Sequence, residues 1–290
     1  MRLYRTMSTR PEHPMTGMDA FAPKEIAHLV ETRGVAKANA ATVPLFVLGV
    51  LAGAFIGLGA VLSTTIATGS SLGYGPTRWL AGIGFSLGLI LVVVAGAELF
   101  TGNNLIVMSL VSGHVTVGRL LRNWAIVYAG NLVGALSIVA MVWAGQWWKQ
   151  ADGAVGATAL ATAAVKTSLP FGVILVRGIL ANALVCLAVW LAVGGRSVLD
   201  KIVAIIFPIA AFVAAGFEHS VANMYFIPLG MAIKDEPGLA QASGVTRAQL
   251  ASLDLGGFLM NLAAATLGNI VDGAFLVGFV YWFVYLRQEP

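Results

Sequence analysis

A long stretch without charged side chains is the feature that most limits how this chain folds. Residues 38–77 contain no Asp, Glu, Lys or Arg, which makes an uncharged run of 40 residues. A helix that crosses the hydrocarbon core of a bilayer needs only about 20 residues. Further runs with few charges or none occupy residues 79–118, 123–148, 167–193, 202–233 and 255–286. The pattern predicts six membrane-spanning segments, the first over residues 42–68.

The composition excludes several classes of protein. Charged residues make up 10% of the chain, against roughly 25% in soluble domains, and hydrophobic residues make up 58%. These values argue against an ordinary soluble enzyme. Cys186 is the only cysteine, so the chain has no intramolecular disulfide and no CxxC metal site. Neither a metal-ligand spacing nor a nucleophile motif occurs, so we expect no metal, no cofactor and no enzymatic activity.

Basic residues predict the orientation of the chain. The N-terminal arm, the second and fourth connections and the C-terminus together carry 11 Lys and Arg, and the opposite side carries five. Cytoplasmic connections are the ones rich in Lys and Arg, so both termini are predicted to be cytoplasmic. We expect an N-terminal arm over residues 1–40 and a transmembrane domain over residues 41–290. In the arm, residues 23–38 have the pattern of an amphipathic helix, either a surface helix at the membrane or a mobile gate.

A short motif occurs twice and indicates two related halves. GNLV at 130–133 returns as GNIV at 268–271. Upstream of each copy, polar residues interrupt a span, at 97–104 and at 216–223. Three spans in each half place the two halves in opposite directions, as in the inverted repeats of transporters and channels. Glycines four residues apart, such as Gly49, Gly53 and Gly57, predict close packing between helices.

The two interrupted spans, the second and the fifth, are predicted to be broken helices. A charge such as Glu98 or Glu218 at the centre of a bilayer costs at least about 2.5 kcal/mol, so it must face protein or water. Non-helical backbone at that depth must line a cavity or lie buried in protein. His219 is either a structural hydrogen-bonding group or a functional one, and Thr101 in the other break is its candidate partner.

Five motifs together resemble a known family. They are FSLGLI at 85–90, AELFT at 97–101, YAGNLVG at 128–134, GILANALVCLAVW at 178–190 and GFEHSVANMYFIP at 216–228. Residues 19–287 are similar to the formate–nitrite transporter family, in particular to its bacterial formate channels. The first 18 residues and the loops at 149–166 and 236–253 depart from the family pattern.

The resemblance implies an aquaporin-like protomer of six transmembrane helices that assembles as a homopentamer, with one pore in each protomer. The polar residues that match the pore are His219 and Thr101 at its centre, Asn182 and Asn269 along its wall, and Lys166 with Glu218 as a charged pair. The residues that match two constrictions are apolar, and without the motifs they would be interpreted as core. They are Leu89, Leu99 and Phe100 in one constriction, and Phe85 and Phe212 in the other.

By the same resemblance, the chain is expected to carry formate and related small monovalent anions across a bacterial inner membrane. Passage is expected to depend on pH, with proton coupling through His219. Nitrite, acetate, lactate and hydrosulfide are alternative substrates. A water or glycerol facilitator is an alternative of a different class, disfavoured because the paired Asn-Pro-Ala signature is absent. The missing metal and nucleophile motifs disfavour a membrane enzyme or an assembly scaffold.

Overall fold

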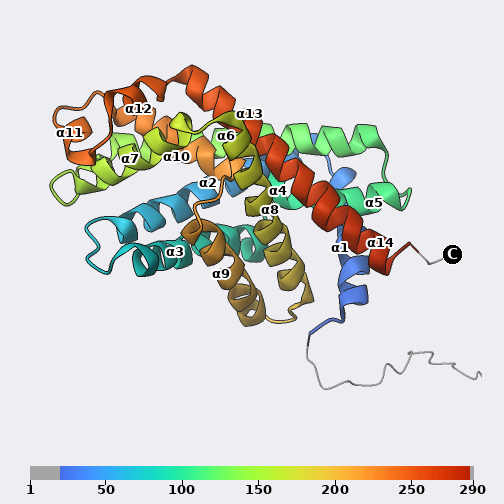
Figure 1. Ribbon diagram of the computed structural model, residues 1–290. Helices are drawn as coiled ribbons and strands as arrows, with labels where there is room; N and C mark the ends of the chain where they lie inside the picture. The colour runs from blue at the N-terminus through green and yellow to red at the C-terminus, as the bar shows by residue number, and fades with distance from the viewer. Residues whose placement is uncertain (1–19, 288–290) are drawn as a thin grey trace, which may run out of the picture.

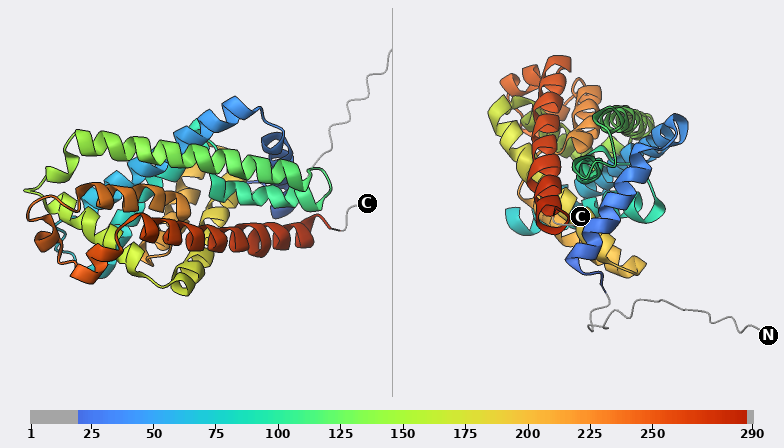
Figure 2. Two further views of the ribbon diagram at one scale, coloured as in Figure 1. Left: turned by 90° about the horizontal axis from the view of Figure 1, so that it is seen from above. Right: turned by 90° about the vertical axis from the view of Figure 1, so that its right-hand side faces the viewer.

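The chain forms an all-helical bundle in a computed structural model that describes residues 20–287 (Figure 1). Among these described residues, five helices are long and apolar enough to cross a membrane. They are α2 (Thr42–Ala67), α3 (Tyr74–Ala95), α6 (Val117–Ala144), α8 (Phe171–Gly194) and a final span over Leu255–Tyr285. Figure 2 shows α6 and the final span running along the long dimension of the bundle. The protein is therefore an all-helical membrane protein, as the uncharged runs predict.

The predicted break in the second span is present. Helix α3 ends at Ala95, and the chain resumes as α4 (Phe100–Asn103), a 3₁₀ turn η1 (Asn104–Ile106) and α5 (Val107–Val111). Gly96, directly after α3, adopts a left-handed backbone with φ of 84°, which an L side chain rarely adopts. The glycine turns the chain out of the helix, and the short helices then re-enter the bundle.

The fifth predicted span is likewise two helices. Helix α9 (Val198–Ala214) and helix α10 (Ser220–Ile233) share the predicted run, with an extended stretch between them. Gly216 has a φ of 71° and takes the place that Gly96 has in the second span. Ser197 caps α9, because its hydroxyl accepts from the Asp200 N–H at 3.1 Å. Each break thus begins at a left-handed glycine.

The final span changes its helical geometry halfway. It starts as α13 (Leu255–Ile270), continues as a π-helical segment η3 (Val271–Phe279) and ends as α14 (Val280–Tyr285). The Asp254 carboxylate caps α13 by accepting from the Gly257 N–H at 2.7 Å. Segments of π-helix occur mostly at functional positions. This one carries Asp272, a buried acid.

Two helices outside the spans pack into the bundle. Helix α1 (Pro23–Ala38) covers the residues predicted as amphipathic, and it packs on η1, α5 and α8 with Ile26 and Val30 buried. Residues 1–19 of the predicted N-terminal arm lie outside the described residues. Helix α7 (Ala154–Ser168) occupies the connection expected to be a loop, because its Ala-rich sequence favours a helix that is too short for a span. The remaining turns are η2 (Trp147–Lys149), α11 (Leu239–Ser243) and α12 (Arg247–Ser252).

Glycines allow two pairs of helices to approach closely, and their spacing in the sequence predicts this for the first pair, α2 and α6. A Cβ atom added to Gly49 of α2 would lie 3.3 Å from Gly130 Cα in α6. A Cβ atom added to Gly178 of α8 would lie 3.3 Å from Gly268 Cα in α13. A larger side chain at any of these sites has to push two backbones apart. The two helix pairs therefore pack through equivalent contacts, one pair in each half of the chain.

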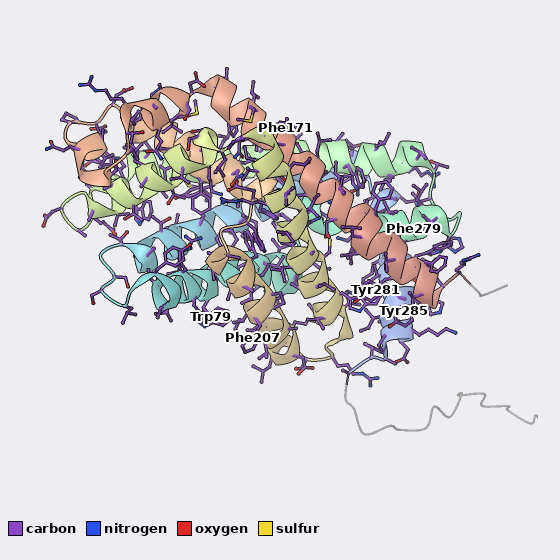
Figure 3. The ribbon with its side chains drawn as sticks, viewed as in Figure 1. Trp79, Phe171, Phe207, Phe279, Tyr281 and Tyr285 are labelled. Carbon is purple, nitrogen blue, oxygen red and sulfur yellow. The ribbon has the colours of Figure 1, made fainter. Side chains whose placement is uncertain are left out.

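The outer surface of the bundle is apolar, and Figure 3 labels several of its aromatic side chains. Phe207 is 61% exposed and Trp79 is 37% exposed, and their rings lie 6.4 Å apart. Phe171 and Phe279 are also exposed. An exterior of this kind suits contact with lipid or with another copy of the chain, because exposure of so much apolar surface to water is unfavourable.

Candidate pore between the two broken helices

The two breaks meet at a hydrogen bond between Thr101 and His219. Thr101 Oγ1 lies 2.9 Å from His219 Nε2, and both side chains are buried. Thr101 is the second residue of α4, and His219 directly precedes α10. The structure therefore brings together the two residues expected at the centre of a pore, from segments 118 residues apart in the chain.

The second nitrogen of His219 sets the direction of that hydrogen bond. The Ala222 N–H donates to His219 Nδ1 at 3.1 Å and so caps α10. A nitrogen that accepts a hydrogen bond carries no proton, so the neutral ring is protonated at Nε2. Nε2 then donates to Thr101 Oγ1. The hydroxyl hydrogen of Thr101 remains available to a third group in the pore.

A cavity of about 410 Å³ adjoins this pair on the side of α7 and α9. We call it the histidine-side cavity, because His219 lines it together with Phe85, Phe212 and Lys166. Phe85 and Phe212 meet edge to face with ring centroids 5.6 Å apart, and the Phe212 ring lies 5.8 Å from the His219 ring. The two phenyl rings therefore lie together beside His219 on the wall of this cavity.

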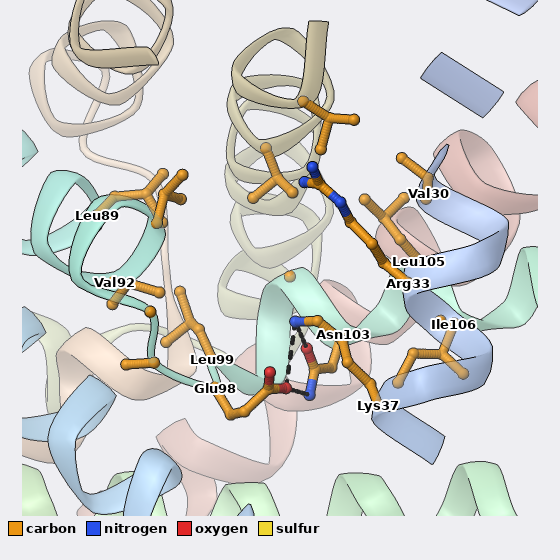
Figure 4. Close-up of a pocket in the computed structure, with 17 residues that line it drawn as sticks. Val30, Arg33, Lys37, Leu89, Val92, Glu98, Leu99, Asn103, Leu105 and Ile106 are labelled. Atoms are coloured by element: carbon orange, nitrogen blue, oxygen red, sulfur yellow. Dashed lines mark hydrogen bonds and ion pairs between the residues drawn. The ribbon is translucent and has the colours of Figure 1, made fainter. Parts of the chain in front are cut away.

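A second cavity of about 290 Å³ lies between α1 and the end of α3 (Figure 4). We call it the α1-side cavity. Leu89 and Leu99 form part of one wall, and Val30 and Arg33 of α1 form part of another. Gly102, the residue after Thr101, also lines it. Buried groups around Thr101 and His219 thus separate the two cavities, and α1 forms a wall of the second one.

Phe100, expected to share a constriction with Leu89 and Leu99, lines neither cavity. Its ring packs edge to face against Trp124 at 6.0 Å and Tyr128 at 4.9 Å between centroids. The side chain points into the interface between α4 and α6, because successive residues of the broken segment face different neighbours. Leu89 and Leu99 are the two residues of this set that border a cavity.

A charged cluster borders the histidine-side cavity. Lys166 Nζ lies 3.0 Å from Glu218 Oε1, and the pair is almost completely buried. The Asn223 side chain donates to Glu218 Oε2 at 2.6 Å. The Asn261 amide donates to the Lys166 carbonyl at 2.9 Å and accepts from Asn223 Nδ2 at 2.7 Å. A buried carboxylate needs such partners, and this one has a cation and an amide.

An equivalent cluster borders the α1-side cavity and was not predicted from the sequence. Lys37 Nζ lies 3.2 Å from Glu98 Oε2, and Asn103 donates to the same oxygen at 2.7 Å (Figure 4). Asn123 accepts from Asn103 at 2.9 Å and donates to the Lys37 carbonyl at 3.0 Å. The signal in the sequence is the spacing, because each glutamate precedes its asparagine by five residues.

Asn131 holds the first break in place. Its side-chain nitrogen donates to the carbonyls of Gly49 at 2.8 Å and Glu98 at 2.9 Å. Its side-chain oxygen accepts from the Phe100 N–H at 2.9 Å. The bonds to the Glu98 carbonyl and the Phe100 N–H satisfy backbone groups that the broken helix leaves without partners, and the bond to Gly49 ties the break to α2.

Asn269, expected along the pore wall, does the same for the second break. Its nitrogen donates to the carbonyls of Gly178 at 2.8 Å and Glu218 at 3.1 Å, and its oxygen accepts from the Ser220 N–H at 2.9 Å. All three partners correspond to those of Asn131. Asn269 thus positions His219 and borders neither cavity. By these matching bonds, Leu99 of the first half occupies the position that corresponds to His219 of the second half.

Asn182 lies behind Thr101 and not in either cavity. Its Nδ2 donates to the Asn269 carbonyl at 2.6 Å and to the Thr101 carbonyl at 3.4 Å. Cys186, one turn along α8, contacts the same Thr101 carbonyl through its sulfur at 3.5 Å. Within residues 20–287, Asn182 Oδ1 is buried and has no hydrogen-bond partner. Asn182 therefore supports the segment that presents Thr101.

Comparisons with known proteins identify one family. A family model described as formate/nitrite transporter matches residues 24–283. The formate channel FocA of Escherichia coli K12 is 43% identical over 275 residues, which covers 93% of this chain and 96% of the relative. A probable formate transporter of Methanothermobacter thermautotrophicus is 36% identical and covers 94% of this chain and 100% of the relative.

Solved structures also resemble this chain. A structure described as a pentameric formate channel with formate bound superposes with a TM-score of 0.76 and 38% identity, over 85% of this chain and 98% of that chain. An ion channel of the same family gives a TM-score of 0.75 with 30% identity, over 92% of this chain and 99% of that one.

Proposed function

This chain belongs to the formate/nitrite transporter family, and from that premise we propose that it is a channel for formate and related small monovalent anions. The observation that carries the proposal is the buried hydrogen bond between Thr101 and His219, which separates two cavities. The relatives named for formate support formate as the substrate. Nitrite, acetate, lactate and hydrosulfide are the alternatives, because all are small and carry one negative charge.

Entry of the anion is an electrostatic step. Lys166 and Arg78 line the histidine-side cavity and attract a negative charge. The N-terminus of α10, whose dipole end is positive, also faces this region. The anion moves from the cavity past the rings of Phe85 and Phe212 to the hydroxyl of Thr101.

The central step decides between the anion and its neutral acid. Taking a bare carboxylate into an apolar constriction costs tens of kcal/mol in the dry limit. Protonating a small carboxylate with a pKa of about 3.5 at pH 7 costs roughly 5 kcal/mol. Thr101, polarised by the Nε2–H of His219, donates a hydrogen bond to the substrate and lowers the cost of desolvating the carboxylate. Proton uptake by the substrate between the constrictions avoids most of that desolvation cost.

The pH dependence follows from the two roles of His219. Protonating Nδ1 removes the acceptor for the Ala222 N–H and places a positive charge in the pore. Glu218, the preceding residue, stabilises that charge. Low pH on the histidine side therefore favours proton-coupled passage, and higher pH favours passage of the anion.

The assembly extends the proposal. Five copies form a ring with one pore in each protomer, by analogy with the pentameric formate channel that resembles this chain. The protein lies in a bacterial inner membrane with both termini in the cytoplasm. The apolar exterior of the bundle supports both contacts with lipid and contacts between copies.

Formate uptake into proteoliposomes tests the function and the role of His219. Wild-type protein is expected to carry formate at a rate that changes with external pH. His219→Phe removes both ring nitrogens, so the pH dependence is expected to disappear. His114→Phe, the same change at a histidine whose side chain is 58% exposed, is the matched control and is expected to behave like wild type.

The same vesicles distinguish the alternatives. Water permeability without anion uptake indicates a facilitator, and the absence of any flux indicates an enzyme or a scaffold. A preference for another anion over formate changes the proposed substrate and leaves the proposed channel function standing. An unchanged pH dependence of formate flux in His219→Phe rejects the role of His219.

A further inference from the structure

Arg177 is a charged residue inside an apolar span, and the proposed pore does not yet use it. It lies in the first third of α8, whose 24 residues have a mean hydropathy of 2.2 over the most apolar stretch. A guanidinium at such a position must reach water or a polar partner. Arg177 is half-buried and lines the histidine-side cavity, which supplies that polar surrounding.

Arg177 differs from the other charged residues of this cavity in having no partner. Lys166 is paired with Glu218 at 3.0 Å. Arg78 donates to the Val213 carbonyl. Within the part of the chain that the structure describes, the Arg177 guanidinium makes no hydrogen bond and no ion pair, although its backbone carbonyl accepts one bond.

The charge balance of the cavity leaves room for an anion. Its charged lining residues are Arg78, Lys166, Arg177 and Glu218. The only carboxylate among these lining residues, that of Glu218, is already taken by Lys166 and by Asn223 at 2.6 Å. The cavity therefore has excess positive charge, and Arg177 is the member whose donors are not used within the described chain. An anion in the cavity would balance the excess positive charge and accept hydrogen bonds from Arg177.

The backbone of Arg177 lies beside the second break. The Glu218 N–H donates to the Arg177 carbonyl at 3.2 Å, which joins α8 to the residue before His219. The Arg177 side chain lines the same cavity as His219, so an anion bound to it would share the cavity that leads to Thr101.

The chemistry of arginine indicates the kind of anion. A guanidinium is planar and presents parallel N–H donors that match the two oxygens of a carboxylate. An ammonium offers the same charge without that fork. Formate and nitrite have two oxygens in one plane, whereas chloride and hydrosulfide have no pair of oxygens to accept two parallel bonds.

We propose that Arg177 binds the substrate at the entrance of the pore and selects planar two-oxygen anions over monatomic ones and hydrosulfide. This inference rests on the proposed function and adds a specificity-determining residue to it. Arg177 holds the anion by two parallel hydrogen bonds in the histidine-side cavity. The anion then passes to the hydroxyl of Thr101, and His219 acts only at that later point.

Concentration series of formate uptake test the proposal at fixed pH and ionic strength. Arg177→Gln and Arg177→Leu are expected to raise the half-saturating formate concentration about tenfold, the factor that one charge-assisted hydrogen bond supplies. Arg177→Lys keeps the charge and loses the fork, so its half-saturating concentration is expected to rise several-fold. The pH dependence is expected to persist in all three variants, because Thr101 and His219 are intact.

Selectivity gives the second readout. The ratio of formate flux to chloride flux is expected to fall in all three variants, including Arg177→Lys. Lys149→Gln removes an exposed positive charge from η2, outside the cavity lining, and is the matched control. It is expected to leave both half-saturation and selectivity unchanged. Elution of each variant in detergent at the wild-type volume confirms that it is folded.

The outcomes separate this inference from the function it rests on. Wild-type vesicles that carry no formate overturn the proposed function and the role of Arg177 together. Formate flux in wild type with unchanged half-saturation in Arg177→Gln and Arg177→Leu overturns the role of Arg177 alone. Full activity and full selectivity in Arg177→Lys also overturn it, because charge without the fork then suffices.

Discussion

At the scale of single residues, Asp272 is the buried acid that neither the pore nor the two charged clusters explain. It is 2% exposed in the π-helical segment of the final span, and its Oδ2 has no hydrogen-bond partner within residues 20–287. The neighbouring Gly273 packs against the side chains of Asn104, Asn182 and Cys186. Asp272 thus lies behind the segment that presents Thr101, among polar side chains that leave one of its carboxyl oxygens without a hydrogen-bond partner.

Asp272→Asn is expected to stabilise the protein. The substitution keeps the shape of the side chain and replaces an acid without a full set of partners by a neutral amide, which is cheaper to bury. A gain of about 1 kcal/mol is the expected size, since an unsatisfied buried polar group costs roughly 1–3 kcal/mol. Thermal unfolding in detergent measures it as a rise in the midpoint.

Asp254→Asn is the matched control for that substitution. Asp254 is the exposed N-cap of the same span, and asparagine caps a helix as well as aspartate does. Its midpoint is expected to stay at the wild-type value. A lower midpoint in Asp272→Asn would show that the carboxyl has a stabilising partner and contradict the prediction.

At the scale of elements, each break depends on one asparagine from the opposite helix. Asn131 and Asn269 make three matching hydrogen bonds each, and every one of them serves the backbone around a break or the helix packed beside it. Without them, buried N–H and C=O groups lose their partners in a place that water does not reach. The repeated GN motif therefore marks structural positions, although the family resemblance implied a place along the pore wall for Asn269.

Asn131→Ala and Asn269→Ala are expected to destabilise the protein to a similar degree. Three lost hydrogen bonds at about 1 kcal/mol each give a loss of roughly 3 kcal/mol in either variant. Both are expected to lower the midpoint of thermal unfolding, and Asn269→Ala is also expected to slow formate uptake because it releases His219.

The control for these two variants is an exposed asparagine with fewer contacts. Asn39→Ala, at the end of α1, removes two exposed bonds, one to the Val35 carbonyl at 2.8 Å and one from the Arg119 guanidinium, and is expected to change the midpoint little. A loss of stability confined to one of the two break asparagines would disprove that the halves are held together in the same way.

The sequence predicted the elements that are determined by local composition. It missed the contacts that depend on which helices pack against each other. Uncharged runs locate the spans, and polar residues with glycines locate both breaks. Helix α7 was expected to be a loop because its 15 residues are too few and too mixed for a span. The Lys37 cluster and the outward turn of Phe100 escaped prediction, because both depend on which helix packs opposite, and periodicity does not reveal that.

At the scale of the whole molecule, the two halves share a scaffold and differ at its centre. Equivalent bonds of Asn131 and Asn269 align Phe100 with Ser220, so Leu99 corresponds to His219 and Thr101 corresponds to Val221. Each half thus supplies one polar residue and one apolar residue at different positions. The hydrogen bond at the centre joins the two halves and has no second copy, and this leaves the pore with a single histidine.

The orientation of the molecule in the membrane can be tested at two glycines that lie at opposite ends of the bundle. In the topology that we propose, six crossings place both termini on one side, and the excess of Lys and Arg on that side predicts that it is cytoplasmic. Gly75 and Gly118 lie in the first turns of α3 and α6, at opposite ends by this topology, and neither has a neighbour within 4 Å of an added Cβ atom. Cys186 is fully buried, so an introduced cysteine at either site is the reactive thiol.

Labelling of intact cells with a membrane-impermeant maleimide is the measurement. Gly75→Cys is expected to react from outside, and Gly118→Cys is expected to react only after the membrane is permeabilised. Wild-type protein, with Cys186 alone, is the control and is expected to stay unlabelled in both conditions. Reaction of Gly118→Cys from outside, with Gly75→Cys protected, would invert the orientation. The histidine-side cavity and Arg177 would then face the cytoplasm, and the chain would receive its anion from within the cell.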